Sequence, residues 1–348
     1  MSPLNPPAPG AGPVVETTIE VIERSQVSQV RRHVIEIAHG LDMSTEDTGR
    51  AALVASEIAS NLAKYGKRGS VTVCPFFDEG SVGVQMIALD HGPGFADFED
   101  SARDGHSTGG SLGIGLGVIM RGSDLFDTYT PLLQGSALLA RVARGRVAPR
   151  PSNARLSLGA CRAAMRGEIE CGDAWAHSSR GRWDRLCVAD GLGHGPLAAV
   201  ASATAIDVFL GAGEDDTPQD IIQRCHSAMN PTRGAVMAVV AIDRETSRFQ
   251  FAGVGNIAGM LHTAVGVNHL LSTEGIVGYQ MRAVRVVEKT WSPGDSVVLS
   301  SDGLSGRLSL SNHARLLQRH PALVAAVLFR DFASDSDDAT VVVAKDLR

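Results

Sequence analysis

Two apolar runs that end in Asp-Gly determine how the second half of the chain is interpreted: Leu186-Cys187-Val188-Ala189-Asp190-Gly191 and Val297-Val298-Leu299-Ser300-Ser301-Asp302-Gly303. A short apolar run that closes on turn residues is typical of a buried strand. We therefore expect Asp190 and Asp302 at strand ends. Hard divalent cations such as Mg²⁺ and Mn²⁺ prefer rigidly held oxygen ligands, with positions left open for water and substrate.

Two more acidic positions extend this pattern. Gly172-Asp173 lies before the Asp190 run, and Asp337-Asp338-Ala339-Thr340 opens the last apolar run, Val341-Val342-Val343. A single Asp-Gly is ordinary turn chemistry, but four carboxylate sites at the edges of β-like segments are less ordinary. The sequence thus predicts a metal site at these carboxylates.

The run Asp190-Gly191-Leu192-Gly193-His194-Gly195 resembles the first metal motif of the PPM-type Ser/Thr protein phosphatases in their SpoIIE/RsbX branch. Ser301-Asp302-Gly303 and Asp337-Asp338-Ala339-Thr340 resemble the two later motifs, and the resemblance covers residues 155–348. It implies an αββα sandwich with two Mn²⁺ or Mg²⁺ ions. In such a site a metal-activated water attacks a phosphoserine or phosphothreonine.

The same resemblance assigns the expected ligands. Asp190 would bridge two ions and the carbonyl of Gly191 would bind one of them, with Asp173, Asp302 and Asp337 supplying the rest and Asp338 as the alternative to Asp337. His194 stands beside these residues and is interpreted either as a general acid or as a residue that only shapes a Gly-rich turn. We leave His194 outside the expected site.

A different constellation occupies the first half of the chain. Glu57 and Asn61 are four residues apart in an apolar helical pattern, so they share one helical face. A buried Asn needs a polar partner, and a phosphate-bound Mg²⁺ would provide one. Downstream, an apolar strand ends in Asp90-His91-Gly92-Pro93-Gly94, and the Gly-rich stretch 107–117 follows. Glycines there would let backbone N–H groups approach phosphate.

Together these motifs resemble the Bergerat (GHKL) ATP-binding fold, and among its members the RsbT/RsbW-like switch kinases, over residues 14–142. The resemblance implies an α/β sandwich that binds ATP with Mg²⁺. Asn61 would hold Mg²⁺, Asp90 would receive the adenine amino group, and Glu57 would be the general base for transfer to a protein hydroxyl. Glu57 can also be interpreted as a solvated or capping acid. The nucleotide and its lid would be lined by Gly92, Gly94, Thr108, Gly113, Gly115 and Gly117.

Length and composition favour an α+β protein of two domains. The chain has 348 residues, which is long for one ordinary core. We expect a flexible Pro-rich tail at 1–13, an ATP-binding domain at 14–142, an Arg/Pro linker at 143–154 and a phosphatase domain at 155–348. Helices are expected at 25–41, 46–65, 112–123, 195–211, 218–229, 304–311 and 321–331, and one of the strands at 168–177.

Charge and cysteine usage narrow the class of partner and compartment. The net charge is -6, and the short Arg-rich stretch at 143–154 lacks aromatic residues, so we expect a solvated linker and no nucleic acid partner. No segment has the pattern of an export signal or a membrane span. Five scattered cysteines without paired spacing fit a reducing cytosol, and we expect a cytoplasmic protein.

The two resemblances imply opposing reactions on one protein. We expect a bifunctional partner-switching regulator, whose substrate is a STAS-domain antagonist or a stressosome-like scaffold and whose output is a sigma factor or another effector. Two alternatives remain open. The N-terminal half could be an ATP-dependent binding module without kinase activity, or the phosphatase half could be a pseudoenzyme scaffold.

Overall fold

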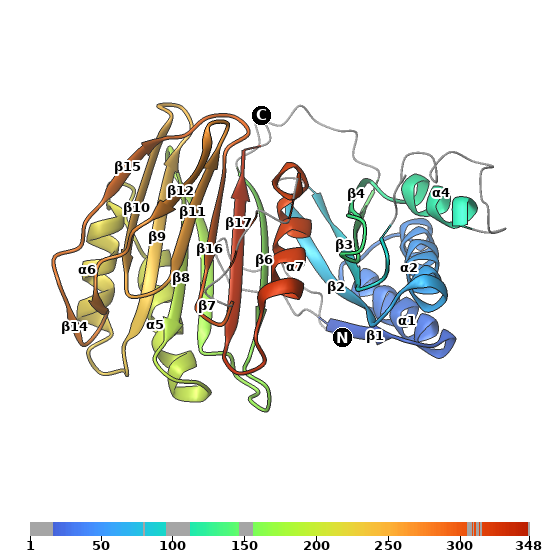
Figure 1. Ribbon diagram of the computed structural model, residues 1–348, viewed down its shortest axis with the longest axis horizontal. Helices are drawn as coiled ribbons and strands as arrows, with labels where there is room; N and C mark the ends of the chain where they lie inside the picture. The colour runs from blue at the N-terminus through green and yellow to red at the C-terminus, as the bar shows by residue number, and fades with distance from the viewer. Residues whose placement is uncertain are drawn as a thin grey trace. The chain divides into compact units, whose positions relative to one another are not determined.

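The computed structural model describes residues 17–78, 81–94, 112–145, 156–304, 308, 310, 313 and 315–346. These residues form two compact units (Figure 1). The first contains residues 17–145 and the described part of 311–327, and the second contains 156–310 and 328–346. One segment of the expected 155–348 domain, 311–327, is therefore counted with the first unit. The expected tail at 1–13 and all but the first three residues of the expected linker lie outside the described residues.

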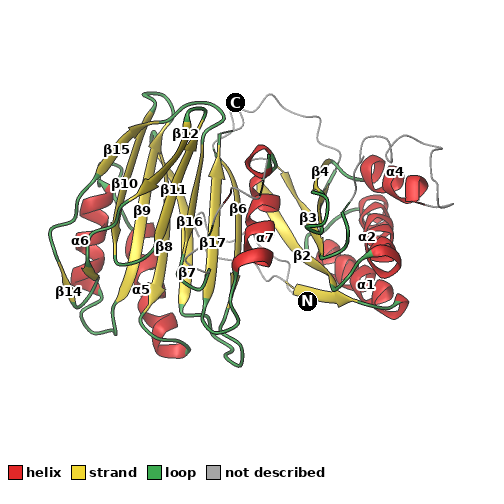
Figure 2. Ribbon diagram, in the orientation of Figure 1, coloured by secondary structure: helices red, strands yellow, loops and turns green. Residues whose placement is uncertain are grey.

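The first unit is one antiparallel sheet with helices packed on it. The strand order is β1-β2-β3-β5-β4. The strands are β1 (Thr17–Val21), β2 (Gly69–Asp78), β3 (Ser81–Asp90), β4 (Leu125–Tyr129) and β5 (Ser136–Ala143). The helices are α1 (Arg24–Gly40), α2 (Thr45–Tyr65) and α4 (Leu112–Gly122), drawn in red in Figure 2. The helices expected at 25–41, 46–65 and 112–123 are confirmed.

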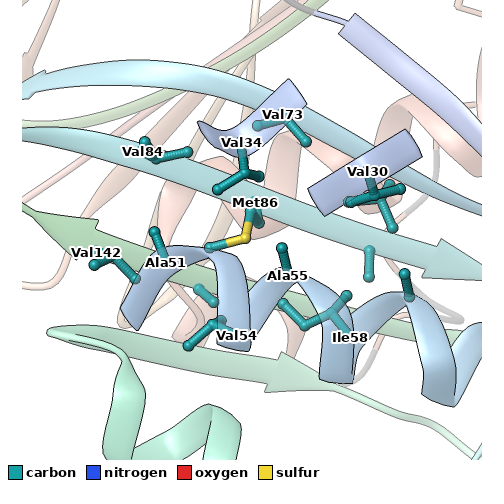
Figure 3. Close-up of a cluster of buried hydrophobic side chains, with 14 of the residues drawn as sticks. Val30, Val34, Ala51, Val54, Ala55, Ile58, Val73, Val84, Met86 and Val142 are labelled. Carbon is teal, nitrogen blue, oxygen red and sulfur yellow. The ribbon is translucent and has the colours of Figure 1, made fainter. Parts of the chain in front are cut away.

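Helix α2 is placed by its apolar face (Figure 3). Apolar residues recur every three or four positions, which puts them on one side of the helix. That side packs against α1 and against strands β2, β3 and β5 in a single buried cluster. Its buried members include Ala51, Val54, Ala55 and Ile58 of α2, Val30 and Val34 of α1, and Val73, Val84, Met86 and Val142 of the sheet. Ser44 caps the start of α2 by accepting a hydrogen bond from the Asp47 N–H (3.0 Å).

Residues of the segment 311–327 pack within the first unit on strand β4. The backbone N–H of His320 donates to Oδ2 of Asp127 over 2.6 Å. The guanidinium of Arg319 lies 3.4 Å from Oδ1 of the same carboxylate. Both oxygens of Asp127 therefore contact this distant segment of the chain.

The second unit contains two five-stranded sheets. Their strand orders are β15-β10-β9-β8-β7 and β12-β11-β16-β17-β6. The first sheet comprises β7 (Asp173–Arg180), β8 (Trp183–Gly191), β9 (Ala235–Asp243), β10 (Arg248–Val254) and β15 (Val287–Thr290). The second comprises β6 (Ser157–Ala163), β11 (Ala258–Thr263), β12 (Gly266–Leu270), β16 (Ser296–Ser300) and β17 (Ala339–Lys345). A two-stranded sheet of its own pairs β13 (Gly275–Ile276) with β14 (Gln280–Met281).

Strand β9 shows how the layers form, because its alternate side chains enter two different cores. Val240 belongs to the cluster between the sheets, together with Phe251 and Leu299. Val239 belongs to the cluster on the other face, with Phe209 of α5 (Pro196–Leu210) and Ile221 of α6 (Pro218–Ala228). The sequence of a strand that is covered on both faces is a continuous run of apolar residues, as in β9. The two-sheet sandwich flanked by helices confirms the expected α+β class.

One local expectation was wrong, and another is not tested. Most of the helix expected at 304–311 lies outside the described residues; Leu304 bridges Ala333 just after α7 (Pro321–Phe332), and Ser334 N–H donates to the Gly303 carbonyl (2.9 Å). The strand expected at 168–177 starts only at Asp173, because the chain turns before it through Gly167 at φ +98.

None of the helices in the described part of the chain is both long and apolar enough to cross a membrane.

Candidate functional sites

A cavity of about 560 Å³ opens beside α2 in the first unit. Its size is within the usual range for small-molecule and cofactor sites. Three of the expected residues, Asn61, Asp90 and Gly94, line it. Gly94 has φ +69, and a Cβ there would lie 2.4 Å from the Pro131 carbonyl oxygen, so only glycine fits this turn. The lining also includes Ile58, Leu62, Lys64, Tyr65, Lys67, Ala88, Leu116, Thr128, Thr130 and Leu138.

The chemistry of this cavity suits an aromatic base joined to an anion. Asp90 is 7% exposed at the end of β3, and its Oδ1 accepts a hydrogen bond from the Gly92 N–H. That contact orients the carboxylate, which can receive an amino group from a base. Apolar side chains such as Ile58, Leu62 and Leu138 form the walls, and Lys64 and Lys67 supply positive charge for phosphate.

The side chains of Glu57 and Asn61 on α2 lie close to Gly115 of helix α4. A Cβ on Gly115 would lie 2.9 Å from Glu57 Oε2 and 3.4 Å from Asn61 Oδ1. The glycine therefore allows α4 to approach both polar side chains. Asn61 lines the cavity, whereas Glu57 and Gly92 are not among its described lining residues. Gly113 and Gly117 lie on the same helix, and Thr108 lies outside the described residues.

Lysine and threonine residues of this cavity were missed in the sequence. Lys64 follows Asn61 by three residues, which places the two on neighbouring positions of one helical face. Thr128 and Thr130 alternate along the β4 segment and line the cavity together. The sequence therefore held a signal for these residues. Helical spacing from Asn61 points to Lys64, and the alternation of side chains along a strand relates Thr128 to Thr130.

The carboxylates of the second unit meet where four strands begin or end. In the register of β7 with β8, Asp173 is opposite Asp190, and Gly191 N–H donates to the Gly172 carbonyl (3.1 Å). Asp302 follows β16, and Asp337 precedes β17, its antiparallel neighbour. Because adjacent antiparallel strands place the end of one beside the start of the next, the sheets gather all four aspartates at one edge.

Asp173 is the most deeply buried of these acids, with 0% exposure. Ser301 Oγ donates to its Oδ2 over 2.6 Å, while among the described residues its Oδ1 has no hydrogen-bond partner. Burial raises the pKa of Asp173, the Ser301 hydrogen bond opposes this, and the charges of Asp338 and Asp302 raise the pKa further. A buried carboxylate oxygen without a partner is costly unless a cation or water satisfies it.

Asp190 experiences the same repulsion more strongly. Burial comes first among the causes that raise its pKa, followed by the negative charges of Asp173, Asp302 and Asp337. Each carboxylate disfavours ionisation of the others, and a bound cation reverses this effect because opposite charge stabilises the ionised forms.

Asp337 and Asp338 have different surroundings. Asp338 is 2% exposed, and its two oxygens accept hydrogen bonds from Met165 N–H (2.8 Å) and Gly172 N–H (2.9 Å). Asp337 lines a cavity of about 510 Å³ together with Asp190 and Asp302. Both carboxylate oxygens of Asp338 therefore already accept hydrogen bonds from backbone amides. The arrangement favours Asp337 as the residue that faces a metal.

A divalent ion such as Mg²⁺ or Mn²⁺ needs several oxygen donors at close range. Within the described part of the chain, no three His, Cys, Asp or Glu side chains converge closely enough to form a ready-made metal cage. The chemistry nevertheless fits. The site offers hard oxygen donors, one buried oxygen of Asp173 without a partner, and carboxylates whose mutual repulsion a cation would relieve.

Residues outside the expected set also line this cavity, among them His194 and Asn256. The Nδ1 atom of His194 lies 2.7 Å from Glu168 Oε1. Asn256 Nδ2 donates to Asp302 Oδ2 over 2.7 Å. Asn256 follows β10 in the run Gly253-Val254-Gly255-Asn256, and a polar residue after Gly at a strand end was the available signal.

Comparisons with known proteins match the two units separately. Residues 22–133 match the family of histidine kinase-like ATPase domains, and residues 181–345 match the family "Stage II sporulation protein E (SpoIIE)". Phosphoserine phosphatase RsbX of Bacillus subtilis (strain 168) is 30% identical over 140 residues, which cover 40% of this chain and 70% of RsbX. Serine/threonine-protein kinase RsbT of the same organism is 29% identical over 125 residues, 36% of this chain and 94% of RsbT.

Two solved structures agree with these matches. One, from a study of the bacterial stressosome as a modular system adapted to control secondary messenger signaling, is 32% identical with a TM-score of 0.52. It covers 55% of this chain and 100% of its own. RsbX in complex with magnesium has a TM-score of 0.50 at 24% identity, covering 57% and 98%, and supports the fold alone. By its second unit the chain belongs to the SpoIIE/RsbX family of PPM-type phosphatases, and its first unit matches the histidine kinase-like ATPase domains and is similar to RsbT.

Proposed function

We propose that the protein is a bifunctional partner-switching regulator. Its first unit phosphorylates a serine or threonine of a STAS-domain antagonist or a stressosome-like scaffold, and its second unit hydrolyses the phosphoester on the same or a related protein. The observation that carries this proposal is the combination of two sites in one chain. Four aspartates gather at one edge of the sheets of the second unit, and Asn61 and Asp90 line a cavity in the first unit. The similarity to a named phosphoserine phosphatase and a named Ser/Thr kinase supports it.

In the second unit, Asp190 would bridge two Mn²⁺ or Mg²⁺ ions, aided by the Gly191 carbonyl, Asp173, Asp302 and Asp337. When bound, such ions supply an acidified water and neutralise phosphoryl oxygens. The chain itself contributes rigidity, since Asp173 is held by Ser301 and lies opposite Asp190 in the strand register. The exposed cavity mouth leaves room for a phosphorylated side chain of another protein.

In the first unit, ATP would bind with its adenine amino group on Asp90 and its phosphates toward Lys64, Lys67 and the start of α4. Asn61 would hold the phosphate-bound Mg²⁺. Glu57 would act as general base toward the substrate hydroxyl. The five cysteines are all free thiols, which suits the cytoplasm in which we place this cycle.

A second candidate function follows from the position of Glu57. A Cβ added to Gly115 of α4 would lie 2.9 Å from the Glu57 carboxylate, and Glu57 is not among the described residues that line the cavity. In this alternative the first unit binds ATP and captures the partner protein, a STAS protein or a sigma factor, without transferring phosphate, and only the second unit is catalytic.

The two functions are separated by a labelling experiment. Purified protein is incubated with γ-labelled ATP, Mg²⁺, Mn²⁺ and candidate STAS proteins from the same genome, using wild type, Glu57→Ala and Asp190→Ala. We expect label on a STAS protein, loss of label with Glu57→Ala and longer persistence with Asp190→Ala. Glu46→Ala and Asp215→Ala, which remove exposed acids of each unit, are the matched controls.

If no label ever forms while pre-phosphorylated STAS protein is still hydrolysed, the first unit is a binding module. Label that forms but decays equally fast in wild type and Asp190→Ala would overturn the phosphatase assignment.

A further inference from the structure

Asn256 stands on a turn whose backbone has little freedom. The preceding residue, Gly255, has φ +89, and a Cβ there would lie 2.1 Å from Val236 Cγ1. Gly255 N–H donates to the Thr273 carbonyl, and Thr273 N–H donates to the Gly253 carbonyl, each over 2.8 Å. Only glycine fits at 255, and the paired hydrogen bonds hold the turn on both sides. The side chain of Asn256 therefore starts from a fixed point at the cavity.

Asp302 is also fixed in its backbone. A Cβ on Gly303 would lie 1.9 Å from the Asp338 carbonyl oxygen, so the chain after Asp302 is pressed against the start of β17. Before Asp302, Ser301 N–H donates to the Thr340 carbonyl (3.0 Å). What stays free is rotation of the Asp302 side chain, which is exposed to solvent. An exposed carboxylate that rotates freely is a poor ligand, because ordering it costs conformational entropy.

The Asn256 amide removes this freedom. Its Nδ2 donates to Oδ2 of Asp302 over 2.7 Å, and both residues line the same cavity as Asp190 and Asp337. We propose that Asn256 is a positioning residue that holds Asp302 in its metal-binding orientation and occupies one of its two carboxylate oxygens. This inference rests on the proposed metal-dependent function of the second unit.

Occupying one oxygen has a consequence for metal choice. Ca²⁺ takes more ligands in flexible geometry and often uses both oxygens of a carboxylate, whereas Mg²⁺ demands a compact octahedron. An Asp302 that keeps Oδ2 on Asn256 binds a metal more readily through Oδ1 alone, because bidentate binding would compete with that hydrogen bond for Oδ2. Asn256 would thus disfavour Ca²⁺ relative to Mg²⁺ and Mn²⁺, in addition to strengthening the binding of the smaller ions.

An amide suits this role better than an acid. Asp190, Asp302 and Asp337 already line this cavity together. A further carboxylate at position 256 would repel them and could not donate a hydrogen bond when ionised. The neutral amide orients Asp302 without adding negative charge to the cavity.

The test measures metal binding by the full-length protein. Mn²⁺ affinity is determined by calorimetry and by the electron paramagnetic resonance of free Mn²⁺, and Ca²⁺ is then titrated as competitor. Asn256→Leu keeps similar volume without a donor, Asn256→His keeps a donor, and Asn268→Ala on β12 is the matched control. Unfolding temperature without metal is recorded for each variant.

We expect Asn256→Leu to weaken Mn²⁺ binding roughly 10-fold, as loss of a residue that orients a ligand does in other metal sites. Its Ca²⁺-to-Mn²⁺ affinity ratio should rise severalfold, and phosphatase activity should recover at saturating Mn²⁺. Asn256→His should retain most of the wild-type affinity. A purely structural role for Asn256 would lower the unfolding temperature without changing the affinity ratio.

Unchanged Mn²⁺ affinity and an unchanged Ca²⁺-to-Mn²⁺ ratio in Asn256→Leu would overturn the inference while leaving the proposed phosphatase intact. A wild-type protein that binds no Mn²⁺ would instead refute the proposed metal-dependent function itself.

Discussion

Asp337 and Asp338 are adjacent in sequence and differ completely in environment. Two backbone amides donate to Asp338, whereas Asp337 lines the cavity with Asp190 and Asp302. Neighbouring residues at a strand entrance point in opposite directions, so one can enter a buried turn while the other faces solvent. At this scale single side chains, more than whole motifs, decide which carboxylates are available to a metal.

Gly115 provides a test at the residue scale. Gly115→Ala places a Cβ against Glu57 and Asn61, and we expect this to displace Asn61 and weaken ATP binding roughly 10-fold, which corresponds to about 1.4 kcal/mol. The unfolding temperature should not fall, because Ala favours helix formation over Gly by about 1 kcal/mol. Titration with a fluorescent ATP analogue measures the affinity.

Gly49→Ala is the control for this substitution, since Gly49 lies on α2 and a Cβ added there would have nothing within 4 Å. It should stabilise the protein and leave nucleotide affinity unchanged. Equal nucleotide affinity in Gly115→Ala and wild type would show that the close approach of α4 to Asn61 is not needed for binding.

Arg50 joins three elements of the first unit. Its guanidinium donates to Asp47 of α2 (2.9 Å), to Asp124 before β4 (2.7 Å) and to the carbonyl of Ala143 at the end of β5 (3.1 Å). Burial would raise the pKa of Asp47, but hydrogen bonds from Gly145 N–H, Arg50 and Ser44 outweigh burial and lower it. Helix α2, which carries Glu57 and Asn61, is thereby tied to the sheet.

At the element scale we expect Arg50→Ala to destabilise the first unit by roughly 3 kcal/mol, because it leaves a nearly buried carboxylate without its cation. The folded-state pKa of Asp47 is lowered, so its stabilising contribution is present above the ordinary Asp pKa and is lost as pH falls through the folded value. The difference in the free energy of unfolding between wild type and Arg50→Ala should therefore shrink from pH 7 to pH 3.

Urea unfolding of both proteins across this pH range measures this difference in the free energy of unfolding. The charged pair Arg248–Glu288 lies on exposed side chains, and Arg248→Ala is the control, expected to change stability little. A difference between wild type and Arg50→Ala that stays constant with pH would rule out Asp47 as its source.

At the scale of the whole molecule, the chain holds two cavities in two separate compact units. A ligand stabilises the unit that binds it, by about 2.7 kcal/mol at a concentration 100 times its dissociation constant. We expect ATP-Mg²⁺ and Mn²⁺ to shift different parts of the unfolding profile, each by a few degrees.

Differential scanning calorimetry with each ligand alone and with both tests this expectation. Asn61→Ala should abolish the ATP-Mg²⁺ shift and retain the Mn²⁺ shift, and Asp302→Ala should do the reverse. Loss of both shifts in either variant would contradict independent sites.

Much of the fold was available from periodicity. Helices α1, α2, α4, α5 and α6 agree with the apolar repeats and stop signals, and the Asp-Gly strand ends indicated where the acidic edge would form. Periodicity failed for β7, which begins only after the turn at Gly167.

The sequence by itself determined the two kinds of chemistry in this protein, because residue type and spacing establish that Glu57 and Asn61 share a helical face and that four aspartates stand at strand edges. Only the tertiary structure decided which of these groups meet. Strand register brings Asp173 opposite Asp190, a turn carries Asn256 to Asp302, and Arg319 and His320 contact Asp127 of β4. Such contacts join residues far apart in the chain, and their geometry depends on how the sheets pair, which no local pattern encodes.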